Sequence, residues 1–281
     1  MREEISACIT ACNEEKNIRR CLSSVTWTDE VVVVDSLSTD RTVEICKQYT
    51  DRVYTHKWRG YIGQKNLIKD LASKPWILFI DADEEISPDL RDEILKELET
   101  QACTDLAGYE FPRLVRFLGK WILHGDWYPD IKLRLFRKDL GRCGGEEPHD
   151  RTIVDGPVKR LKGHMYHHTY DNIADQLATL NKFSGITAEG WHQAGKPYRF
   201  QDLIFRPFFR FLRGYFLKRG FLDGHAGLVI AVTISYGVFL KYAKLWEHHH
   251  LHRQTESKAG SAEAEASHRN GSVPSQAIQN R

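Results

Sequence analysis

Two aspartates separated by one residue, Asp81 and Asp83, follow an apolar run that begins at Ile77. The run has the length of a buried strand, which places both carboxylates at its carboxyl end, where open α/β sheets bind ligands. Carboxylates this close repel each other unless a cation lies beside them, and their oxygens suit Mg²⁺ or Mn²⁺ carrying a ligand's phosphates. The pair therefore predicts a metal and diphosphate site. The alternative is an acidic turn before a helix that Ser87 and Pro88 would open.

Polar residues also follow two earlier apolar runs. Asn13 and Glu15 come after the run 5–11, and Asp35 closes the valine-rich run 30–35. Because the carboxyl ends of parallel strands share one edge of a sheet, we expect these side chains near the aspartate pair, where an acid can accept from ribose hydroxyls. The sequence contains no GxGxxG or GxxxxGK[ST] motif, so the common dinucleotide and P-loop sites lack their phosphate loops.

The elements that must position these residues alternate between short apolar runs and helical periods. Such alternation predicts an α/β fold with a mostly parallel sheet flanked by helices. The expected strands are 5–11, 30–35, 52–54 and 76–80, and the expected helices are 15–24, 40–49, 62–71 and 88–99. Segment 106–160 has strand-like pieces and aromatic residues, and we expect it to complete the sheet and supply binding loops.

The composition limits the class of protein. With 281 residues, 41% of them apolar, the chain can form one substantial core plus an appendage. A net charge of +2 argues against a general nucleic-acid binder, so no nucleic-acid partner is expected. Six cysteines without a CxxC pair indicate reduced thiols of a cytosolic protein, and the charged amino terminus lacks the pattern of a signal peptide.

The character of the sequence changes after about residue 170. We expect three parts: a catalytic domain over 1–170, a helical extension over 171–250, and a disordered tail over 251–281 that is rich in Ser, Ala, Glu and Gln.

The extension contains a segment, 199–220, in which arginines and phenylalanines alternate as in a helix at a membrane surface. The alternative is a core helix with a solvated basic face. Segment 226–240 offers about 15 apolar residues against the ~20 that a membrane-spanning helix needs, which favours a buried or re-entrant helix. We therefore expect a peripheral protein.

Three ordered motifs, at residues 10–15, 35–40 and 81–83, resemble the signatures of family 2 glycosyltransferases of the GT-A fold. Stretches at 64–66, 132–137 and 213–224 resemble the bacterial branch that builds lipopolysaccharide core. The resemblance implies a Rossmann-like GT-A domain that transfers a sugar, with inversion, from a nucleotide-sugar to a lipid-linked glycan acceptor. Segments 199–220 and 226–240 together favour a peripheral location on the cytoplasmic face of the inner membrane, which suits such an acceptor.

The resemblance assigns roles to single residues. Asp83 would bind the divalent ion, Mg²⁺ or Mn²⁺, and Asp81 would contact ribose or metal-bound water. Lys65 would lie near the diphosphate, where its charge offsets the leaving group, although a solvated lysine on a helix surface is the alternative. The residues implied to hold the nucleotide are Asn13, Glu15 and Asp35.

An inverting transfer needs a carboxylate to take the proton of the acceptor hydroxyl. The acidic cluster 146–150 is the best supplier, and we predict Asp150 as the base, with Glu147 second. In related enzymes this region ends in a His followed by an acid, often Glu. An ordinary solvated acidic loop is the alternative.

The histidines of segment 164–168 do not favour zinc, because adjacent residues of a strand face opposite ways. His168 matches the position at which some GT-A enzymes add a late histidine to the metal ion, and a packed histidine is the alternative. The histidines at 248–250 and 252 are expected in solvent.

Three other functions stay open from the sequence. A polyprenyl-phosphate glycosyltransferase would need no strong base, because its acceptor is already a phosphate. A nucleotidyltransferase could share the sheet and the acidic pair, but it usually has a glycine-rich basic loop where this chain has Asn13 and Glu15. A membrane-bound scaffold with a vestigial site is the non-enzyme alternative.

Overall fold

The computed structural model describes residues 2–100, 105–146 and 149–270, with side chains as far as Leu251 except those of Thr100, Glu146 and His149. The described residues form two compact units. The first comprises the residues up to Asn172 together with Lys218–Gly227, and the second comprises Ile173–Leu217 and the chain from Leu228 onward.

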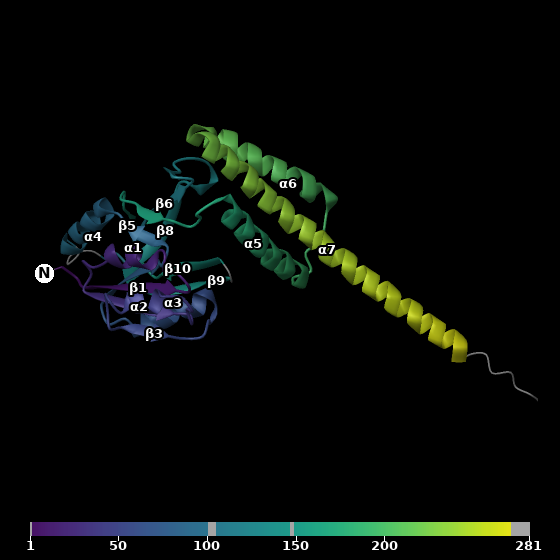
Figure 1. The fold of residues 1–281 in the computed structure, drawn as a ribbon, viewed down its shortest axis with the longest axis horizontal. Helices are drawn as coiled ribbons and strands as arrows, with labels where there is room; N and C mark the ends of the chain where they lie inside the picture. Colours follow the sequence, from purple (N-terminus) through teal and green to yellow (C-terminus); the bar gives the residue numbers. More distant parts are fainter. Residues whose placement is uncertain (1, 101–104, 147–148, 271–281) are drawn as a thin grey trace, which may run out of the picture. The chain divides into compact units, whose positions relative to one another are not determined.

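The first unit is built on a twisted mixed sheet with helices on both faces (Figure 1). Its main strands lie in the order β3-β2-β1-β4-β8-β6-β12-β5, with β7 and β11 paired to β6. The strands are β1 Ile5–Ala11, β2 Glu30–Asp35, β3 Val53–Thr55, β4 Trp76–Asp81, β5 Glu84–Ile86, β6 Gly108–Phe117, β7 Lys120–Trp121, β8 Asp130–Arg137, β11 Val158–Arg160 and β12 Met165–His167.

The half of the sheet that contains β1 is parallel. β1 pairs in parallel with both β2 and β4, and β2 pairs in parallel with β3. These strands are apolar on both faces because crossover helices cover the sheet on each side, as parallel sheets require.

The other half of the sheet includes antiparallel pairs. β8 lies antiparallel between β4 and β6, since the chain turns back after β6 through a short 3₁₀ turn, Gly125–Trp127. A separate two-stranded antiparallel ribbon is formed by β9 Gly141–Glu146 and β10 His149–Val154.

Two apolar clusters hold the helices to the sheet. One cluster joins the sheet to α1 Ile18–Ser23, α2 Thr42–Cys46 and α4 Pro88–Thr100. The other joins it to α3 Gly60–Leu71 and to β9 through Cys143. The core therefore lies on both faces of the sheet, and loops at the carboxyl ends of β1, β2 and β4 are left to carry polar residues.

The second unit is helical and contains α5 Ile173–Gln193, α6 Phe200–Leu212, a π-helical turn Arg213–Leu217, and α7, which runs from Gly224 to Asn270. A 3₁₀ turn, Gly220–Asp223, precedes α7 and belongs to the first unit. α5 packs on α7, where Gln176 Nε2 donates to Thr233 Oγ1 at 2.8 Å and the rings of Trp191 and Tyr242 lie 5.2 Å apart.

The α/β fold with a helical extension is confirmed, including a long apolar helix near the carboxyl terminus, and the expected domain boundaries stay a prediction. The apolar stretch of this helix extends on both sides of segment 226–240, and the expectation of a buried or re-entrant helix stays a prediction. Among the residues described through Leu251, the stretch Gly220–Leu251 is long and apolar enough to cross a membrane, judged by length and composition alone. α7 also continues past residue 250 into the segment predicted to be a disordered tail, and that tail stays a prediction because 271–281 lie outside the described residues.

Candidate functional site

The loops that carry the predicted site meet at one edge of the sheet. Ala11 pairs with Asp35 at the ends of β1 and β2, and Thr10 pairs with Asp81 at the ends of β1 and β4. The parallel register therefore brings the three motifs together, as parallel topology predicts.

The first two loops are joined by hydrogen bonds. The backbone N–H of Asn13 donates to Ser38 Oγ at 2.8 Å, and the N–H of Thr39 donates to Asn13 Oδ1 at 2.8 Å. Asn13 and Leu37 both have positive φ angles, 55° and 62°, a conformation that asparagine tolerates and that is strained for leucine. These contacts fix the shape of the edge beside β4.

Asp35 and Glu15 also form hydrogen bonds in these two loops. Asp35 is fully buried, and its carboxylate accepts from the backbone N–H of Ser38 at 2.9 Å and from the Ser38 hydroxyl. Glu15 Oε2 accepts from the N–H of Arg41 at 3.2 Å. The contacts formed by Asn13, Glu15 and Asp35 in the structure are structural ones, and their contact with a nucleotide stays a prediction.

Asp81 lies between two cations. Lys65 Nζ is 3.3 Å from its Oδ1, and Arg134 Nη2 donates to its Oδ2 at 2.5 Å. Burial opposes ionisation of this carboxyl, but the charges of Arg134 and then Lys65 outweigh it and hold the pKa of Asp81 well below its usual range. Asp81 is therefore an anion that is already neutralised by the protein.

A buried acid, Glu84, stabilises this arrangement. The side chain of Glu84 has no exposed surface, and its Oε1 accepts from Arg113 at 3.0 Å and from Arg134 at 3.1 Å. Its Oε2 accepts from the backbone N–H of Asp81 at 2.9 Å. Arg134 is thus held in place by Glu84 while it reaches Asp81, and Arg113 is held further by Asp130 at 2.7 Å.

Asp83 has a histidine partner, and that partner is His167. Its Nε2 lies 2.9 Å from Asp83 Oδ2, whereas its Nδ1 is buried and has no hydrogen-bond partner among the described residues. Burial opposes ionisation of Asp83, but His167 outweighs it and lowers the pKa of the carboxyl. His168, the histidine predicted for the metal ion, has its side chain at Glu85 instead of Asp83.

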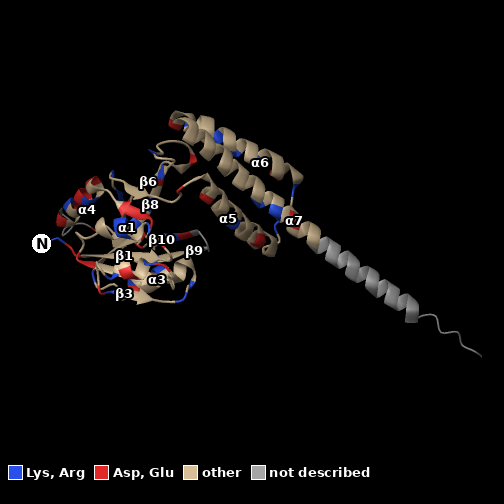
Figure 2. Ribbon diagram, viewed as in Figure 1, with Lys and Arg blue, Asp and Glu red and all other residues tan. Residues whose placement is uncertain are grey.

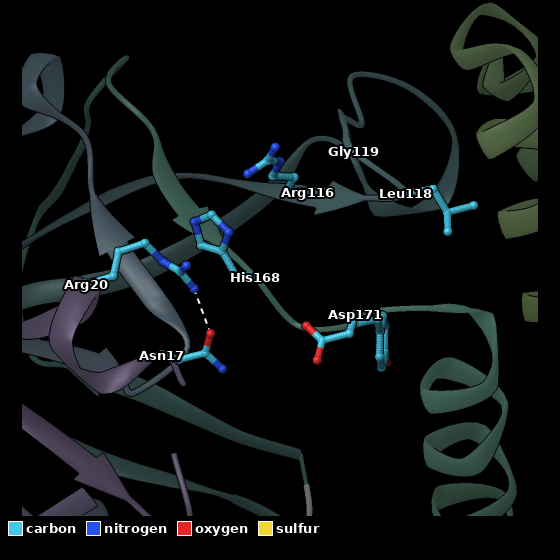
Figure 3. A pocket seen from close by; sticks show the side chains of 8 residues that line it. Asn17, Arg20, Arg116, Leu118, Gly119, His168 and Asp171 are labelled. Atoms are coloured by element: carbon cyan, nitrogen blue, oxygen red, sulfur yellow. Dashed lines mark hydrogen bonds between the residues drawn. The ribbon is translucent and has the colours of Figure 1, made fainter. Parts of the chain in front are cut away.

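His168 faces a recess of about 270 Å³. The recess is also lined by Asn17, Arg20, Arg116 and Asp171 (Figure 3). Its Nε2 lies 3.2 Å from Glu85 Oε2, and only its backbone N–H reaches Asp83, donating to the carbonyl oxygen at 2.9 Å. Burial and the charge of Arg20 lower the pKa of His168. The two adjacent histidines thus point to different partners, as the alternation of a strand requires.

Few protein side chains at this site could bind a divalent ion. Within the described residues, no group of three or more His, Cys, Asp or Glu side chains is placed to hold a metal. Asp83 supplies a carboxylate, and the imidazole of His167 lies beside it. The carboxylate of Asp83 fits Mg²⁺ or Mn²⁺ in the mode in which one or two protein carboxylates hold an ion and substrate phosphates supply the other ligands, and His167 offers a nitrogen beside it.

Asp150 reaches the same place from the β9–β10 ribbon. Its Oδ2 lies 2.9 Å from Lys65 Nζ and 3.5 Å from Cys143 Sγ. Asn66 clamps β9 to α3, because its amide donates to the carbonyl of Cys143 and accepts from its N–H, each at 2.9 Å. Burial, followed by the charge of Asp150, raises the pKa of the Cys143 thiol to about 12, so this cysteine is an uncharged neighbour. Glu147, the second candidate, lies outside the described residues.

A cavity of about 430 Å³ opens between Asp81 and Asp150. Cations dominate its charged lining, which carries two carboxylates. The charged residues that line it are Lys65, Arg113, Lys132, Arg134, Arg151, Asp81 and Asp150. Such a lining, at the carboxyl end of a parallel strand, is suited to a multiply charged anion such as a diphosphate.

Sequence reasoning missed Arg113, Arg134 and His167 as members of the site. Arg134 had a usable signal, since Lys132 and Arg134 alternate with apolar residues in a short strand and so share one face. Arg113 and His167 had no such signal, because each reaches the site only through the pairing of strands that are distant in sequence.

The sequence of this chain is similar to those of known glycosyltransferases. The profile of the family described as "Glycosyl transferase family 2" matches residues 6–153. The lipopolysaccharide core biosynthesis glycosyltransferase LpsC of Rhizobium meliloti (strain 1021) is 33% identical over 254 residues, covering 88% of this chain and 93% of the relative. An uncharacterized glycosyltransferase of Rickettsia typhi (strain ATCC VR-144 / Wilmington) is 31% identical, covering 87% of each chain.

Solved structures show more distant similarity. The mannosyltransferase PcManGT from Pyrobaculum calidifontis, in complex with GDP-Man and Mn²⁺, has a TM-score of 0.49 at 13% identity, covering 88% of each chain. S. aureus TarS 1-349 in complex with UDP-GlcNAc has a TM-score of 0.45 at 16% identity, covering 84% of this chain and 81% of that one.

Proposed function

Because the chain belongs to glycosyl transferase family 2, we propose that it moves a sugar from a nucleotide-sugar donor, with inversion, to a lipid-linked glycan. The observation that carries this proposal is the cationic cavity between Asp81 and Asp150 at the carboxyl end of β4. Membership of the family sets aside the nucleotidyltransferase alternative.

The donor's diphosphate would occupy the part of that cavity beside Asp81, which leaves the part beside Asp150 for the sugar and the acceptor hydroxyl. Lys65 and Arg134 project their charges toward it while they hold Asp81, so positive charge is already in position where negative charge develops on the leaving group. Asn13, Glu15 and Asp35 would border the nucleoside at the neighbouring strand ends. In this assignment Asp81 orients the cations and stays close to the ribose.

Asp83 and His167 would hold the Mg²⁺ or Mn²⁺ ion. When bound, the ion would supply further neutralisation of the departing nucleoside diphosphate. His167 replaces His168 in this proposal because its imidazole is the one beside Asp83.

Asp150 would act as the general base. Inversion by a single displacement needs a carboxylate near the acceptor hydroxyl on the side of the sugar opposite the leaving group. Asp150 is tied to Lys65, so an arriving diphosphate would compete for that lysine and release the carboxylate toward the acceptor. Glu147 stays the second candidate.

The acceptor is proposed to be lipopolysaccharide core, because a relative that spans most of this chain is named for lipopolysaccharide core biosynthesis. An acceptor of this kind has its lipid end in the membrane, which fits the apolar surface of the helical unit. α6 has no buried residue, and Phe205, Phe208 and Phe209 are each more than half exposed. α7 exposes Leu228, Val232 and Tyr236 at intervals of four residues, as on one face of a helix.

Such an apolar surface supports a peripheral location on the cytoplasmic leaflet of the inner membrane. Amphipathic helices with aromatic and basic residues bind at the boundary between headgroups and acyl chains. In Figure 2, α6 and the described part of α7 are mostly tan with separate blue segments. The candidate span Gly220–Leu251 could also enter the bilayer, and protease protection in sealed vesicles distinguishes the two arrangements.

The test of this function uses the full chain with membranes and a panel of labelled sugar nucleotides, with and without Mn²⁺. The expected result is consumption of one donor and transfer of its label to the glycolipid fraction with an inverted anomeric linkage. Label found instead on a polyprenyl phosphate, with turnover undiminished when Asp150 and Glu147 are both replaced by amides, would establish the alternative acceptor. Absence of transfer from every donor would contradict the proposal.

A further inference from the structure

The helical unit contains a cavity of about 500 Å³ that the proposed transfer reaction does not use. All three of its helices contribute to the wall: α5 through Trp191, α6 through Phe209, and α7 through Val238 and Tyr242. These residues make an apolar and aromatic lining. The cavity therefore differs from the polar one beside Asp81.

Four cations share that lining. They are Arg206, Arg210, Arg213 and Lys241. Among the described residues that line this cavity none is acidic, and Asp202, which accepts from Arg206 Nε at 2.6 Å, lies on the same helix one turn away. The described lining thus brings together four positively charged side chains from α6, the π-helical turn and α7.

A fifth cation lies at the same aromatic pair. Lys196 Nζ is 3.1 Å from the ring centroid of Trp191 and 5.3 Å from that of Tyr242, and the guanidinium of Arg206 is 5.6 Å from the same Tyr242 ring. Burial and then the charge of Arg206 lower the pKa of Lys196, which is the effect expected where like charges gather. An anion bound here would relieve that repulsion.

The surroundings of the cavity identify the source of the anion. Phe209, which lines the cavity, has 60% of its surface exposed, and Phe205 and Phe208 beside it are each 55% exposed. A free phosphate ion would gain nothing from these rings, whereas the acyl chains that follow a lipid phosphate would cover them.

We propose that this cavity binds the phosphate of an anionic glycerophospholipid headgroup, with the lipid's chains lying along the exposed phenylalanines of α6. The inference rests on the membrane association proposed above and adds a defined site to it. The site makes membrane binding selective for anionic lipid, beyond the general attraction of a basic surface.

The test measures binding of the full chain to vesicles by flotation, without donor or acceptor. Vesicles of phosphatidylcholine are compared with vesicles of phosphatidylcholine containing phosphatidylglycerol. The double variant Arg210→Gln/Lys241→Gln should lose about fivefold in affinity for each charge removed, on the anionic vesicles only. The matched control Lys182→Gln/Arg199→Gln removes two exposed charges of the same unit outside the cavity and should lose little.

Two further arms separate the possible sources of binding. Phe205→Ser/Phe208→Ser should weaken binding to both kinds of vesicle and keep the preference for anionic lipid. Inorganic phosphate, substituted for chloride at constant ionic strength, should compete only weakly. Circular dichroism and thermal melting of each variant show that the helices persist.

Equal losses in the cavity variant and its control would overturn the site, because they would indicate diffuse surface attraction. Full competition by inorganic phosphate would overturn the lipid as the ligand. Failure of the unaltered chain to bind either vesicle would instead remove the membrane association itself, and sugar transfer, measured separately, would be unaffected by that result.

Discussion

Lys65 Nζ lies 2.9 Å from Asp150 Oδ2, and this ion pair joins two residues 85 positions apart in the sequence. Lys65 comes from α3 and Asp150 from the β9–β10 ribbon, and Asn66 fixes the two elements together. The lysine proposed to meet the leaving group and the acid proposed to deprotonate the acceptor therefore hold each other before any substrate arrives.

Replacing Lys65 should weaken donor binding. Lys65→Gln removes a charge-assisted contact worth about 1.5–3 kcal/mol, so the Kd of the nucleotide-sugar should rise about 10- to 100-fold by calorimetric titration. Arg134 still neutralises Asp81 in this variant, so the fold should persist. Lys47→Gln, at an exposed position, is the control, and an unchanged Kd in Lys65→Gln would exclude Lys65 from the donor site.

Replacing each of the two adjacent histidines in turn provides a matched test of which one binds the metal ion. His167→Gln should weaken Mn²⁺ binding about 10- to 100-fold, and excess Mn²⁺ should restore transfer. His168→Gln should leave the Mn²⁺ requirement unchanged, because its ring contacts Glu85. Mn²⁺ titration followed by electron paramagnetic resonance measures the affinity directly, and the reverse order of effects would return the assignment to His168.

Asp83 should matter more than either histidine, because it supplies the carboxylate that a hard cation prefers. Asp83→Asn and treatment with EDTA should each abolish transfer, and added Mn²⁺ should rescue only the EDTA-treated protein. Asp89→Asn, an exposed acid at the start of α4, controls for the loss of one charge. Transfer by Asp83→Asn at the unaltered rate would defeat the metal site.

Asp150→Asn should lower kcat for transfer about 10²- to 10⁴-fold, the range of a lost general base. Donor binding should not weaken, because Lys65 loses a competing carboxylate. Asp155→Asn, an exposed acid beyond the same ribbon, should behave like the unaltered protein. If Asp150→Asn keeps its rate and Glu147→Gln loses it, the base is Glu147.

Arg134 should be essential for stability as well as for the site. Arg134→Met leaves the fully buried Glu84 with one partner fewer and removes a partner of Asp81, which should cost about 3–5 kcal/mol of unfolding free energy. Urea denaturation measures the change. Arg142→Met, at an exposed arginine, should stay within about 0.5 kcal/mol, and a comparable small effect in Arg134→Met would show that the buried network is dispensable.

Acid should weaken the fold through Asp81. Its pKa is lower in the folded protein than the unfolded value of about 3.9, so its stabilising contribution is complete above about pH 4 and is lost as the pH falls toward the folded value. The free energy of unfolding should therefore fall more steeply below pH 4 in the unaltered chain than in Asp81→Asn. Parallel curves for the two proteins would contradict the assignment.

The local sequence was sufficient for the four strands β1 to β4 and for the edge of the sheet that carries the site. Apolar runs of strand length, separated by helical periods, specify parallel β1, β2 and β4, and parallel topology then places Asn13, Asp35 and Asp81 at one edge. The same local information predicted the helical extension, because the pattern of a helix lies within a few turns of chain.

Contacts between distant segments were decided only by the tertiary structure. Alternation along a strand implies that His167 and His168 face opposite ways, but the register of β12 against β5, with His167 opposite Glu84, determines which of them meets Asp83. The meeting of Lys65 with Asp150 likewise depends on how α3 packs against β9. Such pairings are absent from sequence patterns because register and packing are set by the whole sheet and its two cores, whereas propensity and periodicity are local.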